Sequence, residues 1–293
     1  MSALPALWPL YAKALWPKAL PPEAGCQQTE LTASASAVLS PARQLARYQQ
    51  LCQLAQSPQL PPCWPNVLAF GLQLRLLLQS PFPVMGLVHL SNHISQFRPI
   101  LVAEPLDIKV RLAPVLPHEK GVLLPLVTEV YRKGQLVWQQ QACHLYRTRT
   151  PPALPEPAAD APALAASVAK NISVNAANLH SELKAPRGTG WRYGWLSGDI
   201  NPIHLSDISA RLFGFKAALA HGMWSKARIL AALAPQAPAF DVSVNFSSPL
   251  LLPDRAHLHC QQSSEHGRIT QHFALASPAR QRLLLSGQLQ CAR

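Results

Sequence analysis

Three polar side chains that could handle a water molecule lie within six residues of one another: Asp199, Asn201 and His204. An acid and an imidazole five residues apart do not share a face of a regular helix, where neighbours are three or four residues apart. Because Pro202 disfavours helical geometry at Asn201, we expect a loop here, with His204 entering a short helix. Such a loop can bring the carboxylate and the imidazole together around one water. Since an imidazole exchanges protons near neutral pH, the pattern indicates acid–base chemistry.

A second candidate lies at Gly222, where a long apolar helix is expected to begin. The first backbone N–H groups of a helix have no internal partner, and the helix dipole favours negative charge there. Glycine leaves space for a substrate oxygen to approach the Gly222 N–H, which can polarise a carbonyl and stabilise an enolate. The loss of one such donor typically costs about 10²–10³ in rate. We interpret the preceding His221 as a structural histidine bonded to the backbone.

The candidate residues need supporting elements, and the hydropathy pattern predicts one long helix in each half of the chain. Residues 67–79 and 222–233 are apolar nearly all round, so both helices should be buried on most sides. A short helix is expected at about 206–212, ending near Gly214, which is a natural left-handed cap.

Each long helix is followed by runs with the period-two alternation of strands. These runs lie at 106–110, 121–131 and 136–147 in the first half, and at 256–260, 268–276 and 282–291 in the second. Lys133-Gly134 and Ser277-Pro278 are expected to form hairpin turns. A buried helix followed by an antiparallel meander, present twice, predicts an α+β fold in which a sheet curls around each helix.

A Pro- and Ala-rich segment at 148–170 separates the halves and has the composition of a semi-rigid linker. We therefore divide the chain into a first domain of residues 1–147, the linker at 148–170, and a second domain of residues 171–293. The candidate chemistry lies entirely in the second domain.

The motif residues resemble a known family. G-D-x-N-P-x-H at 198–204, with G-F at 214–215 and A-H-G-M at 220–223, resembles the hydratase 2 motif of MaoC-like enoyl-CoA hydratases and dehydratases. These proteins have hotdog folds, so the resemblance implies tandem hotdog folds, each a long helix wrapped by a curved antiparallel sheet. The first copy looks degenerate, because residues 48–52 before its long helix contain no acid or histidine.

The resemblance also implies an activity. It implies a lyase that reversibly hydrates trans-2-enoyl thioesters to (R)-3-hydroxyacyl thioesters in fatty-acid metabolism. By the same resemblance, Asp199 and His204 hold and activate the catalytic water, Asn201 orients this water or His204, and Gly222 donates to the thioester carbonyl. Which of Asp199 and His204 transfers which proton stays open, as do the direction and the acyl chain length.

Several alternatives remain at this stage. Asp199 and Asn201 could simply cap the following helix. The chain could act as a 3-hydroxyacyl-ACP dehydratase, as a thioesterase, or as a non-catalytic module that binds acyl thioesters.

The composition limits the partners. With 48% hydrophobic and 14% charged residues, the chain is not generally disordered. Its net charge of +12 favours polyanions, but the basic residues form no dense run with interleaved aromatics, which argues against nucleic acid. The phosphates of CoA or an acidic acyl carrier protein fit better. The basic residues near the motif are weak candidates for contact with such a partner: Arg192, Lys216, Lys226 and Arg228. A homodimer is possible.

No metal or redox cofactor is expected. His89 and His93 lack the intervening Glu of a zinc protease helix, residues 87–94 look more like a strand, and His257 and His259 have no third ligand nearby in sequence. The six cysteines are widely scattered, which favours reduced thiols in a cytoplasmic protein. Neither a membrane span nor a secretory signal is predicted.

Overall fold

The computed structural model describes residues 4–14, 30–148, 179–235, 237–265 and 268–292. Its strands are β1 (Leu31–Val38), β2 (Val88–Gln96), β3 (Leu106–Leu112), β4 (Leu116–His118), β5 (Gly121–Arg132), β6 (Gln135–Arg147), β7 (Leu179–Ala185), β8 (Phe240–Phe246), β9 (Asp254–Glu265), β10 (Arg268–Ser277) and β11 (Arg282–Ala292). Its helices are α1 (Leu7–Ala14), α2 (Ala42–Cys52), α3 (Trp64–Gln79), α5 (Thr189–Ser197), α6 (Asp207–Leu212) and α7 (Gly222–Leu233), with a 3₁₀ turn η3 at Pro202–His204.

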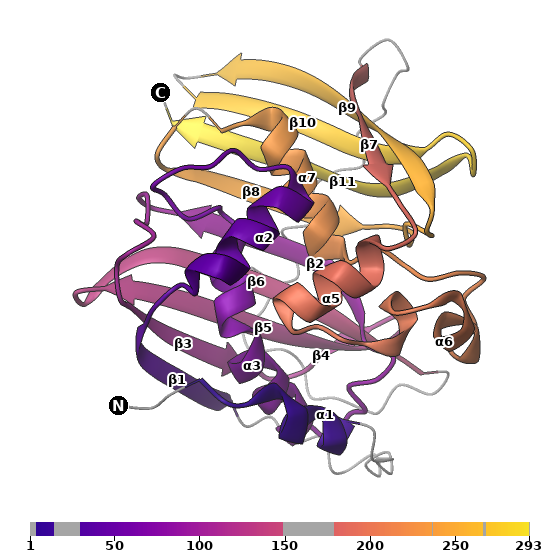
Figure 1. Cartoon of the computed structure of the whole chain (residues 1–293), viewed down its shortest axis with the longest axis horizontal. Coiled ribbons are helices and arrows are strands. Elements are labelled where there is room, and N and C mark those ends of the chain that lie inside the picture. Colours follow the sequence, from indigo (N-terminus) through magenta and orange to yellow (C-terminus); the bar gives the residue numbers. More distant parts are fainter. Residues whose placement is uncertain (1–3, 15–29, 149–178, 236, 266–267, 293) are drawn as a thin grey trace.

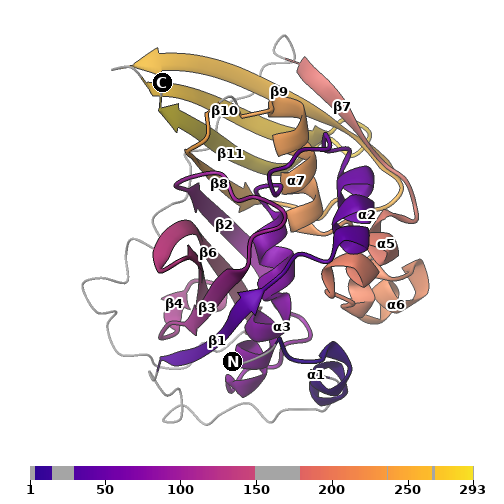
Figure 2. The same cartoon turned by 60° about the vertical axis from the view of Figure 1, so that its left-hand side comes forward.

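The strands form one antiparallel sheet whose order shows an internal duplication. The order is β1-β3-β5-β6-β2 in the first half and β8-β11-β10-β9-β7 in the second, with β4 added on β5. The second half therefore repeats the first in mirrored order. The sheet curves, with α3 against the first half and α7 against the second (Figures 1 and 2). The predicted α+β architecture of two helix-and-sheet units is confirmed.

The two halves meet at a continuous seam, where β2 pairs with β8 from Ser91 opposite Asn245 to Gln96 opposite Phe240. Lys226 of α7 crosses this seam on the helix side of the sheet. Its Nζ donates to Asn92 Oδ1 at 2.6 Å, and to the carbonyl oxygens of Asn92 and Val242 at 3.1 Å each. One side chain thus joins β2 of the first half to β8 of the second.

The long helices are buried as their apolar patterns predict. α7 has the predicted bounds, whereas α3 begins three residues before the predicted start, at Trp64, because Pro65 fits the first turn of a helix. The strand runs predicted at 121–131, 136–147, 268–276 and 282–291 correspond to β5, β6, β10 and β11 within one or two residues. Most of the predicted linker lies outside the described residues, so the domain boundaries stay predictions.

Two of the basic residues suggested as partner contacts are in the wrong place for that role. Lys226 is 0% exposed and Arg228 is 8% exposed. The Arg228 guanidinium donates to the Cys52 carbonyl at 3.1 Å and so fastens α7 to the end of α2. Burial lowers the pKa of Lys226 to about 7. Arg192 and Lys216 are exposed as expected.

Two further expectations concern the described residues. No disulfide joins any of the five cysteines among them, which are Cys52, Cys63, Cys143, Cys260 and Cys291. No helix in the described part of the chain is long and apolar enough to cross a membrane.

The Lys226 contacts give a test of the seam. We expect Lys226→Ala to lower the free energy of unfolding by about 2–5 kcal/mol, because it leaves a cavity and removes the hydrogen bonds that Nζ donates to three oxygen atoms. Urea unfolding followed by circular dichroism measures this loss. Lys216→Ala, at an exposed position ten residues earlier, is the matched control and should stay close to the wild type. Equal stability of the two variants would contradict the structural role of Lys226.

Candidate active site

The candidate residues lie on an irregular segment between α5 and α6, as the sequence predicts. α5 ends at Ser197 and is capped by Gly198, whose φ of +83° is in the left-handed region that glycine adopts readily. The loop continues to Asn201, and η3 ends at His204. Asn201 Oδ1 accepts the Ile203 N–H at 3.3 Å, so this side chain does cap the following turn. Asp199 Oδ1 accepts the Asn201 N–H at 3.4 Å, so this carboxylate bonds to the residue before η3 and not to η3 itself.

The backbone of Leu219 fixes the orientation of His204. The Leu219 N–H donates to the Ile203 carbonyl at 3.1 Å, and the Leu219 carbonyl lies 2.9 Å from His204 Nδ1. Because a carbonyl oxygen only accepts, the proton of a neutral His204 ring must be on Nδ1. The lone pair of Nε2 is then free to act as a base.

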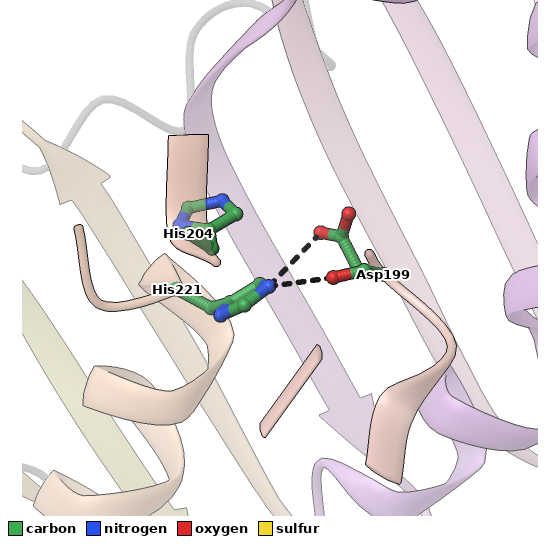
Figure 3. A group of neighbouring side chains, drawn as sticks. All are labelled: Asp199, His204 and His221. Atoms are coloured by element: carbon green, nitrogen blue, oxygen red, sulfur yellow. Dashed lines mark hydrogen bonds and ion pairs between the residues drawn. The ribbon is translucent and has the colours of Figure 1, made fainter. Parts of the chain in front are cut away.

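A third side chain, His221, belongs to the same cluster. Its ring stacks on that of His204, with centroids 3.6 Å apart, and it is 3% exposed. His221 Nε2 donates to the Asp199 carbonyl at 2.9 Å and lies 3.7 Å from Asp199 Oδ2 (Figure 3). The expected backbone bond of His221 is therefore present. The sequence analysis missed its contact with His204, because no local pattern relates residues seventeen apart.

Partial or full removal from water sets the charge states of the cluster, in which His221 is buried and Asp199 and His204 are half-buried. The pKa of His204 is lowered to about 3, mainly by loss of water and to a smaller extent by the neighbouring His221, while Asp199 and the bond to Leu219 oppose the change. Burial likewise lowers the pKa of His221 to about 4. Desolvation raises the pKa of Asp199, against the opposing influence of His204. At neutral pH both rings are uncharged, and the carboxylate takes up a proton more readily than an ordinary aspartate.

Gly222 is the first residue of α7, as predicted, but its lack of a side chain has a further reason. A Cβ there would lie 2.7 Å from the ring of Phe246, so the ring occupies the space that a larger residue would need. Among the described residues, no backbone acceptor is seen for the Gly222 N–H. This N–H is therefore free to bind a substrate oxygen.

α5 packs on the motif through two glycines. A Cβ on Gly190 would lie 2.1 Å from the His204 carbonyl oxygen and 2.9 Å from that of Leu219, and one on Gly194 would lie 2.8 Å from the Asp199 carbonyl oxygen. The sequence analysis missed this contact. The four-residue spacing of the glycines places them on one face of the helix and could have indicated it.

The cluster has the donor types of a metal site. One ligand atom from each of Asp199, His204 and His221 lies within 4.8 Å of the other two. However, a cation on His221 Nε2 would displace the hydrogen bond to the Asp199 carbonyl. The expectation of no metal stays a prediction.

Comparison with known proteins identifies the family that the chain resembles. A profile of the MaoC-like domain family matches residues 170–276. The chain is 33% identical over 225 residues to 3-hydroxyacyl-thioester dehydratase X of Mycobacterium tuberculosis (strain ATCC 25618 / H37Rv), and the alignment covers 73% of this chain and 74% of that relative.

Solved structures with similar architecture cover nearly the whole chain. The crystal structure of HtdX of Mycobacterium tuberculosis matches with a TM-score of 0.72 at 28% identity, covering 89% of this chain and 99% of that chain. A MaoC-like dehydratase from Phytophthora capsici matches with a TM-score of 0.66 at 17% identity, and the match covers 92% of this chain and 96% of that chain. A Mycobacterium tuberculosis protein described as having a double hotdog fold matches with a TM-score of 0.54 at 14% identity, and the match covers 92% of this chain and 98% of that chain. The predicted tandem hotdog fold is confirmed.

The close approach of α5 to the motif can be tested. We expect Gly190→Ala to lower the free energy of unfolding by about 1–3 kcal/mol, because the methyl group collides with the backbone that holds His204. Chemical unfolding measures the loss. Gly188→Ala is the matched control, because the nearest atom to its new methyl group belongs to the Trp191 side chain at 3.2 Å. If both alanines were tolerated equally, the packing of α5 on the motif would be wrong.

The buried, neutral His221 predicts acid sensitivity. The unfolded chain binds a proton on each histidine near pH 6.5, whereas folded His221 does so only near pH 4. Stability should therefore fall as the pH drops below about 6.5, by about 1.4 kcal/mol per pH unit for each such histidine. Urea unfolding at pH 7.5, 6 and 5 should show a shallower dependence for His221→Asn. The exposed His180→Asn should keep the wild-type slope, and an unchanged slope in His221→Asn would show that His221 is not held neutral.

Proposed function

Since the chain belongs to the MaoC-like domain family, we propose that it is a lyase that interconverts 3-hydroxyacyl and trans-2-enoyl thioesters by removal or addition of water. The observation that carries this proposal is the neutral His204, whose free Nε2 belongs to the same cluster as the Asp199 carboxylate. The proposed (R) configuration of the hydroxyacyl product follows from the motif that the chain shares with the hydratase 2 type.

The site offers a group for each change in charge during hydration. Asp199 and His204 hold a water, and His204 Nε2 or the carboxylate accepts its proton as the oxygen bonds to C3. The electron pair moves through C2 to the thioester oxygen, where the Gly222 N–H stabilises the developing enolate. A proton then returns to C2, and dehydration follows the reverse path. Asn201, which caps η3, keeps the loop in shape and leaves its amide NH₂ to orient the water or His204.

The thioester carrier is CoA or the phosphopantetheine arm of an acyl carrier protein. Both carry negatively charged phosphate, which the net charge of +12 attracts. Arg192 and Lys216 are exposed near the motif, where they can contact the phosphate of either carrier. We place the reaction in cytoplasmic fatty-acid metabolism, without a metal or redox cofactor. The two halves complete one sheet within a single chain, so a homodimer is not needed for that purpose.

The activity can be measured directly. Purified protein mixed with a short trans-2-enoyl-CoA should decrease the absorbance of the conjugated thioester. Asp199→Asn and His204→Ala should lower kcat by about 10²–10⁴, because each removes a group that handles the proton of the water. Circular dichroism checks that both variants stay folded, and His180→Asn, at an exposed position of β7, is the control that should keep full activity.

Other outcomes favour the alternatives. Turnover of carrier-bound but not CoA-bound substrates indicates an acyl-carrier-protein dehydratase. Release of free thiol from a saturated acyl-CoA indicates a thioesterase. Binding without turnover at any chain length indicates a non-catalytic module and contradicts the proposed lyase activity.

A further inference from the structure

We propose that Tyr11 is a positioning residue for Asp199: its hydroxyl bonds to the backbone on both sides of this residue and holds the carboxylate in place beside His204. The expected effect on catalysis rests on the proposed function, whereas the hydrogen bonds do not. Tyr11 lies in α1, 188 residues before Asp199 in the sequence.

The contacts surround one residue of the loop. The Tyr11 hydroxyl donates to the Gly198 carbonyl at 2.6 Å, and it accepts the Ile200 N–H at 2.8 Å. The peptide groups before and after Asp199 are therefore fixed by the same oxygen atom. The carbonyl of Asp199 itself accepts from His221 Nε2 at 2.9 Å. Together these bonds fix the loop on either side of the point where the carboxylate leaves the backbone.

The Tyr11 side chain is buried among residues of the first half of the chain. It is 8% exposed and packs in a cluster with Ala14 of α1 and Leu74 of α3. Ile200 of the motif loop packs against the same cluster. The position of the loop thus depends on α1 and α3, which carry no motif residue.

Gly198 shows how closely α1 approaches the loop. A Cβ there would lie 2.7 Å from a methyl carbon of Leu7 and 3.2 Å from the ring of Phe70. A residue larger than glycine would have to displace the Leu7 side chain, and the φ of +83° at this position also favours glycine.

The state of the hydroxyl favours positioning over proton transfer. Burial raises the pKa of Tyr11, with a smaller contribution from the negative charge of Asp199, so the phenol stays neutral at physiological pH. Its one proton is given to the Gly198 carbonyl, and its oxygen already accepts the Ile200 N–H. A phenylalanine at position 11 would fill the same space as the tyrosine ring. The hydroxyl is therefore the group whose removal tests the positioning role.

The test compares Tyr11→Phe with a matched control. We expect Tyr11→Phe to lower kcat for enoyl-CoA hydration by about 10–100-fold, since small displacements of a catalytic group have effects of this size. KM should change by less than about threefold, because the thioester contacts are not altered. Tyr131→Phe removes a tyrosine hydroxyl that donates to Glu129 Oε2 at 3.0 Å on β5, and it should leave kcat and KM unchanged.

A second measurement does not depend on turnover. Hydrogen exchange of the Ile200 amide should become faster in Tyr11→Phe and stay unchanged in Tyr131→Phe. The ¹³C titration of the Asp199 carboxyl should move toward the ordinary aspartate range as water enters the loosened loop. The fraction folded is checked by thermal unfolding of each variant.

These measurements separate the possible failures. If Tyr11→Phe keeps kcat within twofold of the wild type, or if Ile200 exchange is unchanged, the positioning role is wrong. A fall in kcat that matches the loss of folded protein also overturns it, because stability then explains the effect. If the wild type turns over no enoyl thioester, the proposed function fails, and the exchange and titration data still decide whether Tyr11 holds Asp199.

Discussion

The hydrogen bond between His204 Nδ1 and the Leu219 carbonyl determines what the site can do. It fixes the ring tautomer, and burial next to His221 keeps that ring uncharged, so a lone pair is available on Nε2. The carbonyl is itself held, because Leu219 bridges to Leu251 and its N–H donates to Ile203. Without this bond the imidazole could rotate, and the cluster of Asp199, His204 and His221 would lose its shape.

The first half of the chain has no motif, yet the site depends on it. α1 reaches the loop through Tyr11, and the end of α2 accepts hydrogen bonds from Trp224 and Arg228 of α7. Lys226 joins the strands of the two halves where they meet. If the proposed function holds, duplication of the fold has left one half with the reacting groups and the other half with the side chains that support them.

Much of the fold and of the site could be predicted from the sequence because the signals are local. The period-two runs gave β5, β6, β10 and β11, and Pro202 correctly placed a loop before η3. The contacts that the sequence did not reveal join distant residues, such as His204 with His221 and Tyr11 with Gly198. Lys226 was misjudged because a lysine is usually exposed, and its burial depends on oxygen atoms contributed by β2 and β8.

The most direct test of the central claim is ¹⁵N NMR of the imidazole nitrogens of His204 in the resting enzyme at pH 7. The structure predicts a neutral ring with the proton on Nδ1 and a lone pair on Nε2. A protonated, cationic ring, or a neutral ring with its proton on Nε2, would contradict the assignment of His204 as the base that acts with Asp199.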